Sequence, residues 1–182
     1  VDLKAFSDDL YRKVCSARLQ PVLETITYLV TETPVWVELT TLLIPGLNDS
    51  SDEIDALSSW VADSLGPDVP LHLTAFHPDF KMLKTPPTPK STLTRARRIA
   101  LDNGVKFAYT GNVHDEGGGS TTCHECGELL IGRDWYLLTA WNLDDAGHCR
   151  SCGALCPGRF DGPAGDWGPR RLPVRLRDFA DQ

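Results

Sequence analysis

The sequence predicts an α/β protein in which a parallel sheet is followed by a small cysteine-rich module. Segments with the composition of strands alternate with amphipathic segments of helical period, once every roughly 30 to 35 residues, as in βαβ units. The composition changes at Gly111, because residues 111–120 contain four glycines and few apolar side chains. Two Cys-x-x-Cys-Gly units follow. We therefore expect domains at residues 1–112 and 113–160, and an extended tail at residues 161–182.

Strands are predicted where β-branched and apolar residues cluster between turn residues. The expected strands of the first domain are residues 1–4, 35–44, 70–77 and 105–109. Residues 35–44 are largely apolar, which is typical of a strand buried on both faces. In residues 1–4, alternation places Asp2 and Lys4 on the same side. In the second domain, residues 134–138 are the expected hairpin strand between the two cysteine pairs.

Helices are predicted from apolar residues at helical spacing and from residues that favour helix ends. They lie within residues 7–14, 21–32, 50–65 and 91–103. Ser7 is a suitable N-cap for the first, Ser50 or Ser51 for the third, and Ser91 or Thr92 for the fourth. Three arginines of the fourth helix are expected on its solvated side: Arg95, Arg97 and Arg98.

Composition and charge exclude several classes of function. A hydrophobic share of 41% is sufficient for a globular core. The net charge of −7 and the lack of a basic run do not favour nucleic-acid binding. There is no apolar run long enough for a membrane span and no signal peptide. The start without Met suggests a fragment, and the cysteine pattern favours reduced thiols in a cytoplasmic protein.

The strongest chemical signal is the repeated Cys-x-x-Cys-Gly unit. Two thiolates three positions apart can bind one metal ion from a tight turn, and the following glycine can adopt the positive φ that the turn requires. The two units are separated by 22 residues, a spacing typical of a four-sulfur tetrahedral site that most often holds zinc. The expected ligands are Cys123, Cys126, Cys149 and Cys152. Cys156 and Cys15 are expected to be buried thiols without a ligand role.

Polar residues also follow the predicted strands of the first domain. Because the carboxyl ends of parallel strands meet at one edge, such residues can form a binding site there. They are Asp2, Lys4, Thr40, Thr41, His77, Asp79, Thr110, Asn112, His114 and Asp115. His72 and His77 are expected on opposite faces, and His77 is favoured for the site. The alternative, that these residues form turns and caps, has about equal weight.

Several motifs resemble those of radical SAM proteins. More narrowly, the chain resembles the radical SAM component of the AmmeMemoRadiSam gene system, a relative of the pyruvate formate-lyase activating enzymes. The resemblance runs from Val1 to about Gly158 and includes the doubled cysteine unit. Its motifs are Val1-Asp2-Leu3-Lys4-Ala5-Phe6, Leu43-Ile44-Pro45-Gly46-Leu47-Asn48-Asp49-Ser50, Phe76-His77-Pro78-Asp79, Thr85-Pro86-Pro87-Thr88-Pro89 and Tyr109-Thr110-Gly111-Asn112-Val113.

This resemblance implies a partial TIM-type (βα) barrel that binds S-adenosylmethionine (SAM) against a 4Fe-4S cluster. Reductive cleavage of SAM would then give a 5′-deoxyadenosyl radical. By position, Asp2 and Lys4 match the Asp-x-Lys pair near the methionyl end of SAM, and His77 matches a pocket histidine. Thr40 stands on the strand where the activating enzymes commonly carry a basic residue. The resemblance also suggests Memo-like and Amme-like partner proteins.

The sequence departs from the family in its cysteines, because none of the six forms the cluster motif Cys-x3-Cys-x2-Cys. The nearest arrangement, Cys149-x2-Cys152-x3-Cys156, has the reverse order. We therefore expect the C-terminal half of a partial barrel followed by a rubredoxin-like zinc ribbon, with no SAM cleavage by this chain alone. The alternative is a non-catalytic zinc-ribbon interaction module carried on an α/β half-domain.

Overall fold

The computed structural model describes residues 1–160, so the predicted tail at residues 161–182 lies outside the described residues. The described residues form two compact units. The first contains Val1–Gly119 and Pro157–Arg159, and the second contains Ser120–Cys156 and Phe160. No helix in the described part of the chain is both long and apolar enough to span a membrane.

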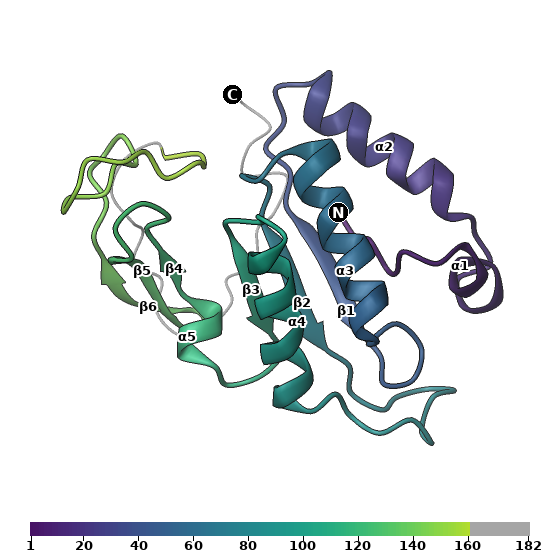
Figure 1. Cartoon of the computed structure of the whole chain (residues 1–182). Coiled ribbons are helices and arrows are strands. Elements are labelled where there is room, and N and C mark those ends of the chain that lie inside the picture. The colour runs from purple at the N-terminus through teal and green to yellow at the C-terminus, as the bar shows by residue number, and fades with distance from the viewer. Residues whose placement is uncertain (161–182) are drawn as a thin grey trace, which may run out of the picture. The chain divides into compact units, whose positions relative to one another are not determined.

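The first unit is an α/β structure built on a three-stranded parallel sheet in the order β1-β2-β3. This confirms the predicted alternation of strands and helices (Figure 1). Its elements are α1 (Asp8–Val14), α2 (Leu19–Thr31), β1 (Leu39–Leu43), α3 (Ser51–Trp60) with a π-helical extension η1 (Val61–Leu65), β2 (Leu71–Ala75), α4 (Lys90–Asp102), β3 (Ala108–Gly111) and α5 (Glu116–Gly119).

Within residues 1–160 the sheet is fully buried on one face only, so the expectation of a strand covered on both faces at residues 35–44 is wrong for the described part of the chain. Side chains of β1 and β2 alternate strictly between buried and partly exposed. The buried set, which includes Leu39 and Leu71, packs against α3 and α4 through residues such as Ile54 and Leu93. We call the other side the open face. Its sheet positions are Thr40, Leu42, His72, Thr74, Tyr109 and Gly111.

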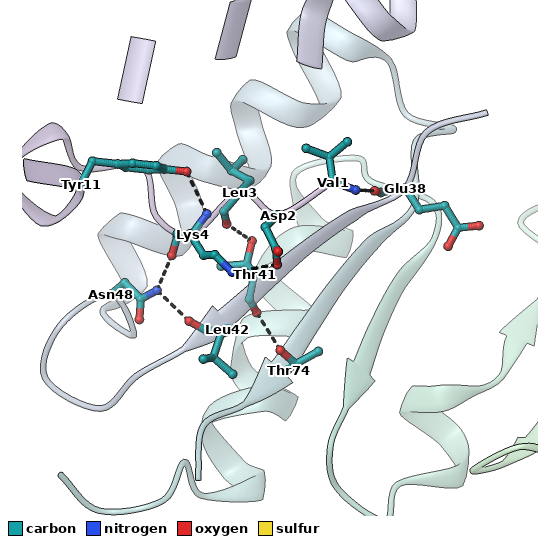
Figure 2. A network of polar contacts seen from close by, with 10 residues as sticks. All are labelled: Val1, Asp2, Leu3, Lys4, Tyr11, Glu38, Thr41, Leu42, Asn48 and Thr74. Carbon is teal, nitrogen blue, oxygen red and sulfur yellow. Dashed lines mark hydrogen bonds and ion pairs between the residues drawn. The ribbon is translucent and has the colours of Figure 1, made fainter. Parts of the chain in front are cut away.

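The segment before α1 runs parallel to β1, but it forms only a single β-bridge, between Asp2 and Thr40, so the strand expected at residues 1–4 is present only as this bridge. The amide of Leu3 donates to the Thr40 carbonyl at 3.0 Å, and the Thr40 amide donates to the Val1 carbonyl at 2.9 Å. Leu3 is fully buried, whereas Asp2 and Lys4 are exposed. The pairing therefore places the charged side chains of this segment beside the open face (Figure 2).

Two of the three predicted helix caps are confirmed. The hydroxyls of Ser7 and Ser50 accept hydrogen bonds from backbone amides in the first turns of α1 and α3, at 3.4 and 3.2 Å. The prediction for α4 is wrong, because the helix begins after Pro89 and not at Ser91 or Thr92. Pro89 has an extended backbone and makes no side-chain cap, and its carbonyl accepts the Thr92 amide at 3.0 Å.

The boundary of the first unit lies after Gly119, whereas the sequence placed it at residue 112. Asp115 accounts for the difference. Its carboxylate accepts a hydrogen bond from the Thr110 hydroxyl at 2.9 Å, and its carbonyl accepts one from the Gly119 amide at 2.7 Å. These bonds connect α5 to the end of β3, so the glycine-rich segment is part of the first unit.

The second unit contains an antiparallel sheet in the order β4-β5-β6. Its strands are β4 (Thr121–Thr122), β5 (Leu129–Asp134) and β6 (Leu137–Trp141). The hairpin strand predicted at residues 134–138 is misplaced, because Trp135 and Tyr136 form the turn between β5 and β6. Trp135 has a φ of 52°, a left-handed conformation for which its sequence gives no signal.

Three further predictions about single side chains have mixed outcomes. Cys156 is buried, as expected, whereas Cys15 is exposed and is not a core thiol. Two arginines of α4 are bonded to the protein and not simply solvated. Arg95 donates to the Asp49 carbonyl at 2.7 Å, and Arg97 donates to the Ala108 carbonyl at 2.8 Å. These bonds connect α4 to the loop after β1 and to β3.

Candidate metal centre and candidate binding face

The structure brings the four predicted cysteine ligands together in the second unit. The Sγ atoms of Cys123 and Cys152 are 3.7 Å apart, and those of Cys126 and Cys149 are 3.8 Å apart. All four sulfur atoms lie within 4.8 Å of one another. These separations are far longer than a disulfide bond, and all four thiols are free.

These separations fit a single tetrahedral ion. With metal–sulfur bonds of about 2.3 Å, the edges of a regular tetrahedron of thiolates are about 3.8 Å long. The two measured separations match that edge. A cluster of several irons would attach each thiolate to a different metal atom and would spread the sulfurs further apart. The four cysteines can therefore hold one metal ion.

Each cysteine pair lies on a turn with the same hydrogen bonds. The Gly127 amide donates to the Cys123 carbonyl at 2.9 Å, and the Gly153 amide donates to the Cys149 carbonyl at 2.8 Å. Gly127 and Gly153 have φ values of 75° and 77°, which a residue with a Cβ adopts only at a cost. The glycine after each Cys-x-x-Cys unit is thus explained by backbone geometry, as the sequence predicted.

The environment of Cys149 favours the thiolate that a metal requires. Burial by itself would raise the pKa of this thiol. The backbone amides of Cys152 and Ser151 donate towards its sulfur, and with the neighbouring thiols of Cys152 and Cys126 they lower the pKa to about 7. Cys123 and Cys149 are buried, while Cys126 and Cys152 are exposed, so the site is at the surface of the unit.

The two histidines beside the cysteines are not part of the metal set. Nδ1 of His148 lies 3.3 Å from the Asp144 carboxylate, and Nε2 of His124 lies 3.4 Å from the Glu125 carboxylate. Asp144 also accepts the backbone amides of His148 and Ala146 at 2.8 and 3.0 Å. The first of these hydrogen bonds lowers the pKa of Asp144. Sequence reasoning missed this aspartate, which organises the loop that leads to the second cysteine pair.

Charged side chains form a second candidate site beside the open face of the first unit. Nζ of Lys4 lies 3.0 Å from the Asp2 carboxylate, and both side chains are about half exposed. Asp2 pairs with Thr40 in parallel register. Thr40 is partly exposed at a sheet position of the open face. Three of the four predicted cofactor residues are therefore close together in the backbone pairing, since Thr40 lies on β1 and Asp2 and Lys4 lie on the segment that pairs with it. Figure 2 shows Asp2 and Lys4 of this group.

The fourth predicted residue, His77, does not lie on a strand. β2 ends at Ala75, and His77 is exposed in the segment that follows. Its role in a binding site stays a prediction. The histidine that does lie on the open face is His72, which shares the register of Thr40.

Sequence reasoning missed a group of side chains around His72. Nε2 of His72 lies 2.7 Å from the Glu38 carboxylate, which also accepts the indole N–H of Trp36 at 3.0 Å. The His72 ring stacks on Tyr109, with centroids 5.1 Å apart and an interplanar angle of 27°. Two-residue alternation along the strands could have placed His72, Thr40 and Tyr109 on the same face. The sequence could not show how β1, β2 and β3 are aligned.

Asn48 connects the turn after β1 to the segment that carries Lys4. It is almost fully buried. Its Oδ1 accepts the Ile44 amide at 2.6 Å, and its Nδ2 donates to the carbonyls of Lys4 and Leu42 at 2.7 and 2.9 Å. Figure 2 shows the last two bonds beside the Asp2–Lys4 pair. For Asn48, the structure supports a positioning role within the turn.

Thr88 has the same kind of role after β2. Its hydroxyl donates to the Leu43 carbonyl at 2.6 Å and accepts the Phe76 amide at 2.9 Å. The buried threonine of the Thr-Pro-Pro-Thr-Pro motif therefore connects the carboxyl ends of β1 and β2. The conformation of this edge of the sheet depends on Asn48 and Thr88, whereas Asp2, Lys4 and His77 remain accessible to a ligand.

Comparisons with known proteins identify the fold. No family model matches the sequence. An uncharacterized protein of Methanocaldococcus jannaschii is 43% identical over 154 residues, which are 84% of this chain and 46% of that protein. A domain of the pyruvate-formate lyase-activating enzyme from Bacteroides vulgatus has a TM-score of 0.53 and 20% identity, over 61% of this chain and 65% of that domain. The chain thus spans about half of the curated relative, and over 61% of its length its α/β fold is similar to that of an activating-enzyme domain.

Proposed function

We propose that this chain is the C-terminal part of a cytoplasmic radical SAM enzyme of the AmmeMemoRadiSam type. Its parallel sheet would be part of a partial (βα) barrel, and its four-cysteine unit would be a zinc ribbon. The observation that carries the proposal is the Asp2–Lys4 pair, held beside the open face of a sheet with the fold of an activating-enzyme domain. The matched region is only 46% of the curated relative, which supports the proposal that the complete enzyme is longer.

The charges of Asp2 and Lys4 complement the methionyl end of SAM. This end carries an ammonium and a carboxylate, so Asp2 would accept from the ammonium and Lys4 would donate to the carboxylate. Separating the two side chains requires little free energy, because exposed ion pairs contribute only about 0 to 1 kcal/mol. Thr40 would add a hydroxyl hydrogen bond where the activating enzymes commonly have a positive charge.

The radical chemistry itself would come from SAM and a 4Fe-4S cluster that reduces it. The cysteines of this chain do not fit the cluster, because four of them form a site for one ion. Cys15 lies alone on the surface, and Cys156 lies outside that set. Ligands for the cluster would therefore come from outside this chain, and this chain by itself should not cleave SAM. Memo-like and Amme-like proteins remain the proposed partners.

The metal of the ribbon is proposed to be zinc with a structural role. Four thiolates complete a tetrahedral shell and leave no position for a substrate or a water. We expect about one zinc and no iron per purified chain, because four-thiolate sites with this spacing most often hold zinc. Elemental analysis with a test for labile sulfide checks this. Stoichiometric iron with sulfide would contradict the assignment.

Binding of SAM tests the role of the open face. We expect Asp2→Asn and Lys4→Met each to weaken SAM binding about tenfold, since a hydrogen bond to a charged group contributes about 1.5 to 3 kcal/mol. Calorimetric titration of the zinc-loaded chain measures the affinity. The matched controls are Asp9→Asn and Lys13→Met, which remove the same charges from an exposed pair on α1. The proposal would be contradicted if the control variants weakened SAM binding as much as the Asp2 and Lys4 variants do. It would also be contradicted if the wild-type chain did not bind SAM.

The alternative function is a non-catalytic interaction module. The second unit supports it, because several of its large apolar side chains are exposed. They are Leu129, Trp135, Tyr136, Leu137 and Leu155. The same titration distinguishes the two functions, since an interaction module requires no affinity for SAM.

A further inference from the structure

The four-cysteine site has two exposed and two buried members. Cys126 and Cys152 are exposed, whereas Cys123 and Cys149 have exposed fractions of only 3% and 1%. In both Cys-x-x-Cys units the exposed member is the second cysteine. A small molecule dissolved in the solvent can therefore reach one cysteine on each turn.

Each exposed sulfur lies beside a buried sulfur of the other turn. Sγ of Cys152 is 3.7 Å from Sγ of Cys123, and Sγ of Cys126 is 3.8 Å from Sγ of Cys149. A disulfide bond is about 2.05 Å long, so the sulfurs of each pair need to approach by about 1.7 Å to form one. Such a small movement becomes possible once no ion holds the sulfurs apart.

An accessible thiolate beside a second thiolate is the arrangement that oxidants convert to a disulfide. Oxidation of a cysteine follows its thiolate character and its exposure, and a neighbouring cysteine resolves the sulfenic acid that forms first. A bound metal requires all of its cysteine ligands to be thiolates. The site therefore offers two sulfurs that an oxidant can reach and two buried sulfurs that can resolve them.

We propose that the four-cysteine site is a site of reversible oxidation by hydroperoxides, which convert it to the disulfides Cys126–Cys149 and Cys123–Cys152. Each disulfide joins one exposed and one buried sulfur and links the two turns. The inference rests on the metal site proposed above, because a bound ion keeps the four sulfurs close together as thiolates. Oxidation leaves no thiolate for the ion, so the metal is released.

Each disulfide forms in two steps that consume one hydroperoxide. The exposed thiolate attacks one oxygen of hydrogen peroxide, the O–O bond breaks, and with one proton from the solvent a sulfenic acid and a water form. The buried thiolate then attacks the sulfenic sulfur, the S–O bond breaks, and a second proton gives a second water. The two sulfurs lose two electrons to the peroxide, so the complete site consumes two peroxides and four protons.

Disulfides between the turns keep the second unit connected after the metal has left. The Cys126–Cys149 bond encloses 22 residues and the Cys123–Cys152 bond encloses 28 residues, including β5 and β6. Cross-links around loops of this length restrict the unfolded chain. A disulfide within one Cys-x-x-Cys unit would enclose only two residues and would leave the turns unconnected. The oxidised unit therefore differs from the reduced unit without metal.

Titration of the full, metal-loaded chain with hydrogen peroxide tests the proposal. A colorimetric chelator measures the released ion, and mass spectrometry of the alkylated and digested chain identifies the disulfides. Cleavage after Glu125 and after Arg150 separates the two cysteines of each unit, so all pairings can be distinguished. We expect one ion released per two peroxides, the two disulfides between the turns, and recovery of metal binding after reduction with a dithiol.

Variants separate the exposed sulfurs from the other cysteines. Cys15→Ser and Cys156→Ser replace the two cysteines outside the four-sulfur set and should change neither the metal release nor the disulfides. The double variant Cys126→His and Cys152→His replaces both exposed sulfurs by another zinc ligand and leaves a Cys2His2 set. It should release its ion at least about tenfold more slowly, because no exposed thiolate remains for the peroxide to oxidise.

Three outcomes would overturn the proposal. One is that the disulfides form within the Cys-x-x-Cys units or include Cys156. Another is that the metal leaves with sulfinic acids in place of disulfides, so that a dithiol does not restore binding. The third is equal rates of release from the wild-type chain and the double histidine variant. Metal analysis before the peroxide is added tests the proposed zinc separately, because the mapped disulfides depend on the sulfurs and not on which ion leaves.

Discussion

Replacing Cys149 by serine is expected to unfold the second unit and release its metal, while the first unit stays folded. Cys149 is one of the four cysteines of the proposed zinc site, and structural zinc contributes about 10 to 16 kcal/mol of apparent binding free energy at neutral pH. The unit has little else to stabilise it. Apart from the cysteines, its buried apolar side chains are only Leu130, Ile131 and Leu143 within the described residues.

The two units should respond separately to this change. NMR signals of residues 120–156 should collapse to the narrow range of an unfolded chain, whereas those of β1, β2 and β3 should keep their positions. Removing the metal with a chelator should give the same spectrum as Cys149→Ser. The first unit does not depend on the metal, because its core consists of apolar side chains of the sheet and the helices.

Cys156→Ser is the matched control. Cys156 is as buried as Cys123, but it lies outside the four-sulfur set. The same chemical change at Cys156 should leave the metal content unchanged. It should lower the free energy of unfolding of the second unit by about 1 to 3 kcal/mol, because a hydroxyl is then buried. Dispersed signals of residues 120–156 and full metal content in Cys149→Ser would show that the four sulfurs do not stabilise the ribbon.

Features that depend on neighbouring residues were predictable from the sequence. The Cys-x-x-Cys-Gly units indicated which four sulfurs lie close together, because each turn positions two sulfurs and its own glycine locally. The prediction of Ser7 and Ser50 as helix caps was also correct, because a cap depends only on the first turn of its own helix. The alternation of strands and helices indicated a parallel sheet, since βαβ connections favour that arrangement.

Features that depend on the packing of distant segments were not predictable. The apolar composition of residues 35–44 suggested burial on both faces, yet helices cover one face only of β1 in the described structure. The pair of Glu38 and His72 joins residues 34 positions apart, and it forms only once β1 and β2 are in register. Arg95 and Arg97 have the spacing of a solvated helix face, but carbonyls of other segments accept their hydrogen bonds.

Replacing Asn48 by alanine is expected to destabilise the first unit by about 2 to 4 kcal/mol. The change removes three hydrogen bonds of an almost fully buried side chain. The Ile44 amide and the carbonyls of Lys4 and Leu42 would then lack these partners. Each buried polar group left unpaired costs about 1 to 3 kcal/mol, although relaxation of the turn after β1 should recover part of the total.

The effect of Asn48→Ala should be measured within the first unit, because the ribbon unfolds separately. Urea denaturation followed through the NMR signals of β1 and β2 isolates this unit. Asn103→Ala is the matched control. Its Nδ2 also donates to three acceptors, on Asp55 and Ser58, but it is only partly buried, and water can replace it there. We expect Asn103→Ala to lower the free energy of unfolding of the first unit by less than about 1 kcal/mol.

The same substitution connects the stability of the turn to the proposed binding of SAM. Asn48 holds the backbone of Lys4 beside the backbone of Leu42, and thereby keeps the Asp2–Lys4 pair next to the open face. Asn48→Ala should therefore weaken SAM binding even at temperatures where the unit remains folded, because the two charges lose their fixed position. Unchanged SAM affinity together with the expected loss of stability would show that the turn stabilises the fold without positioning the charges.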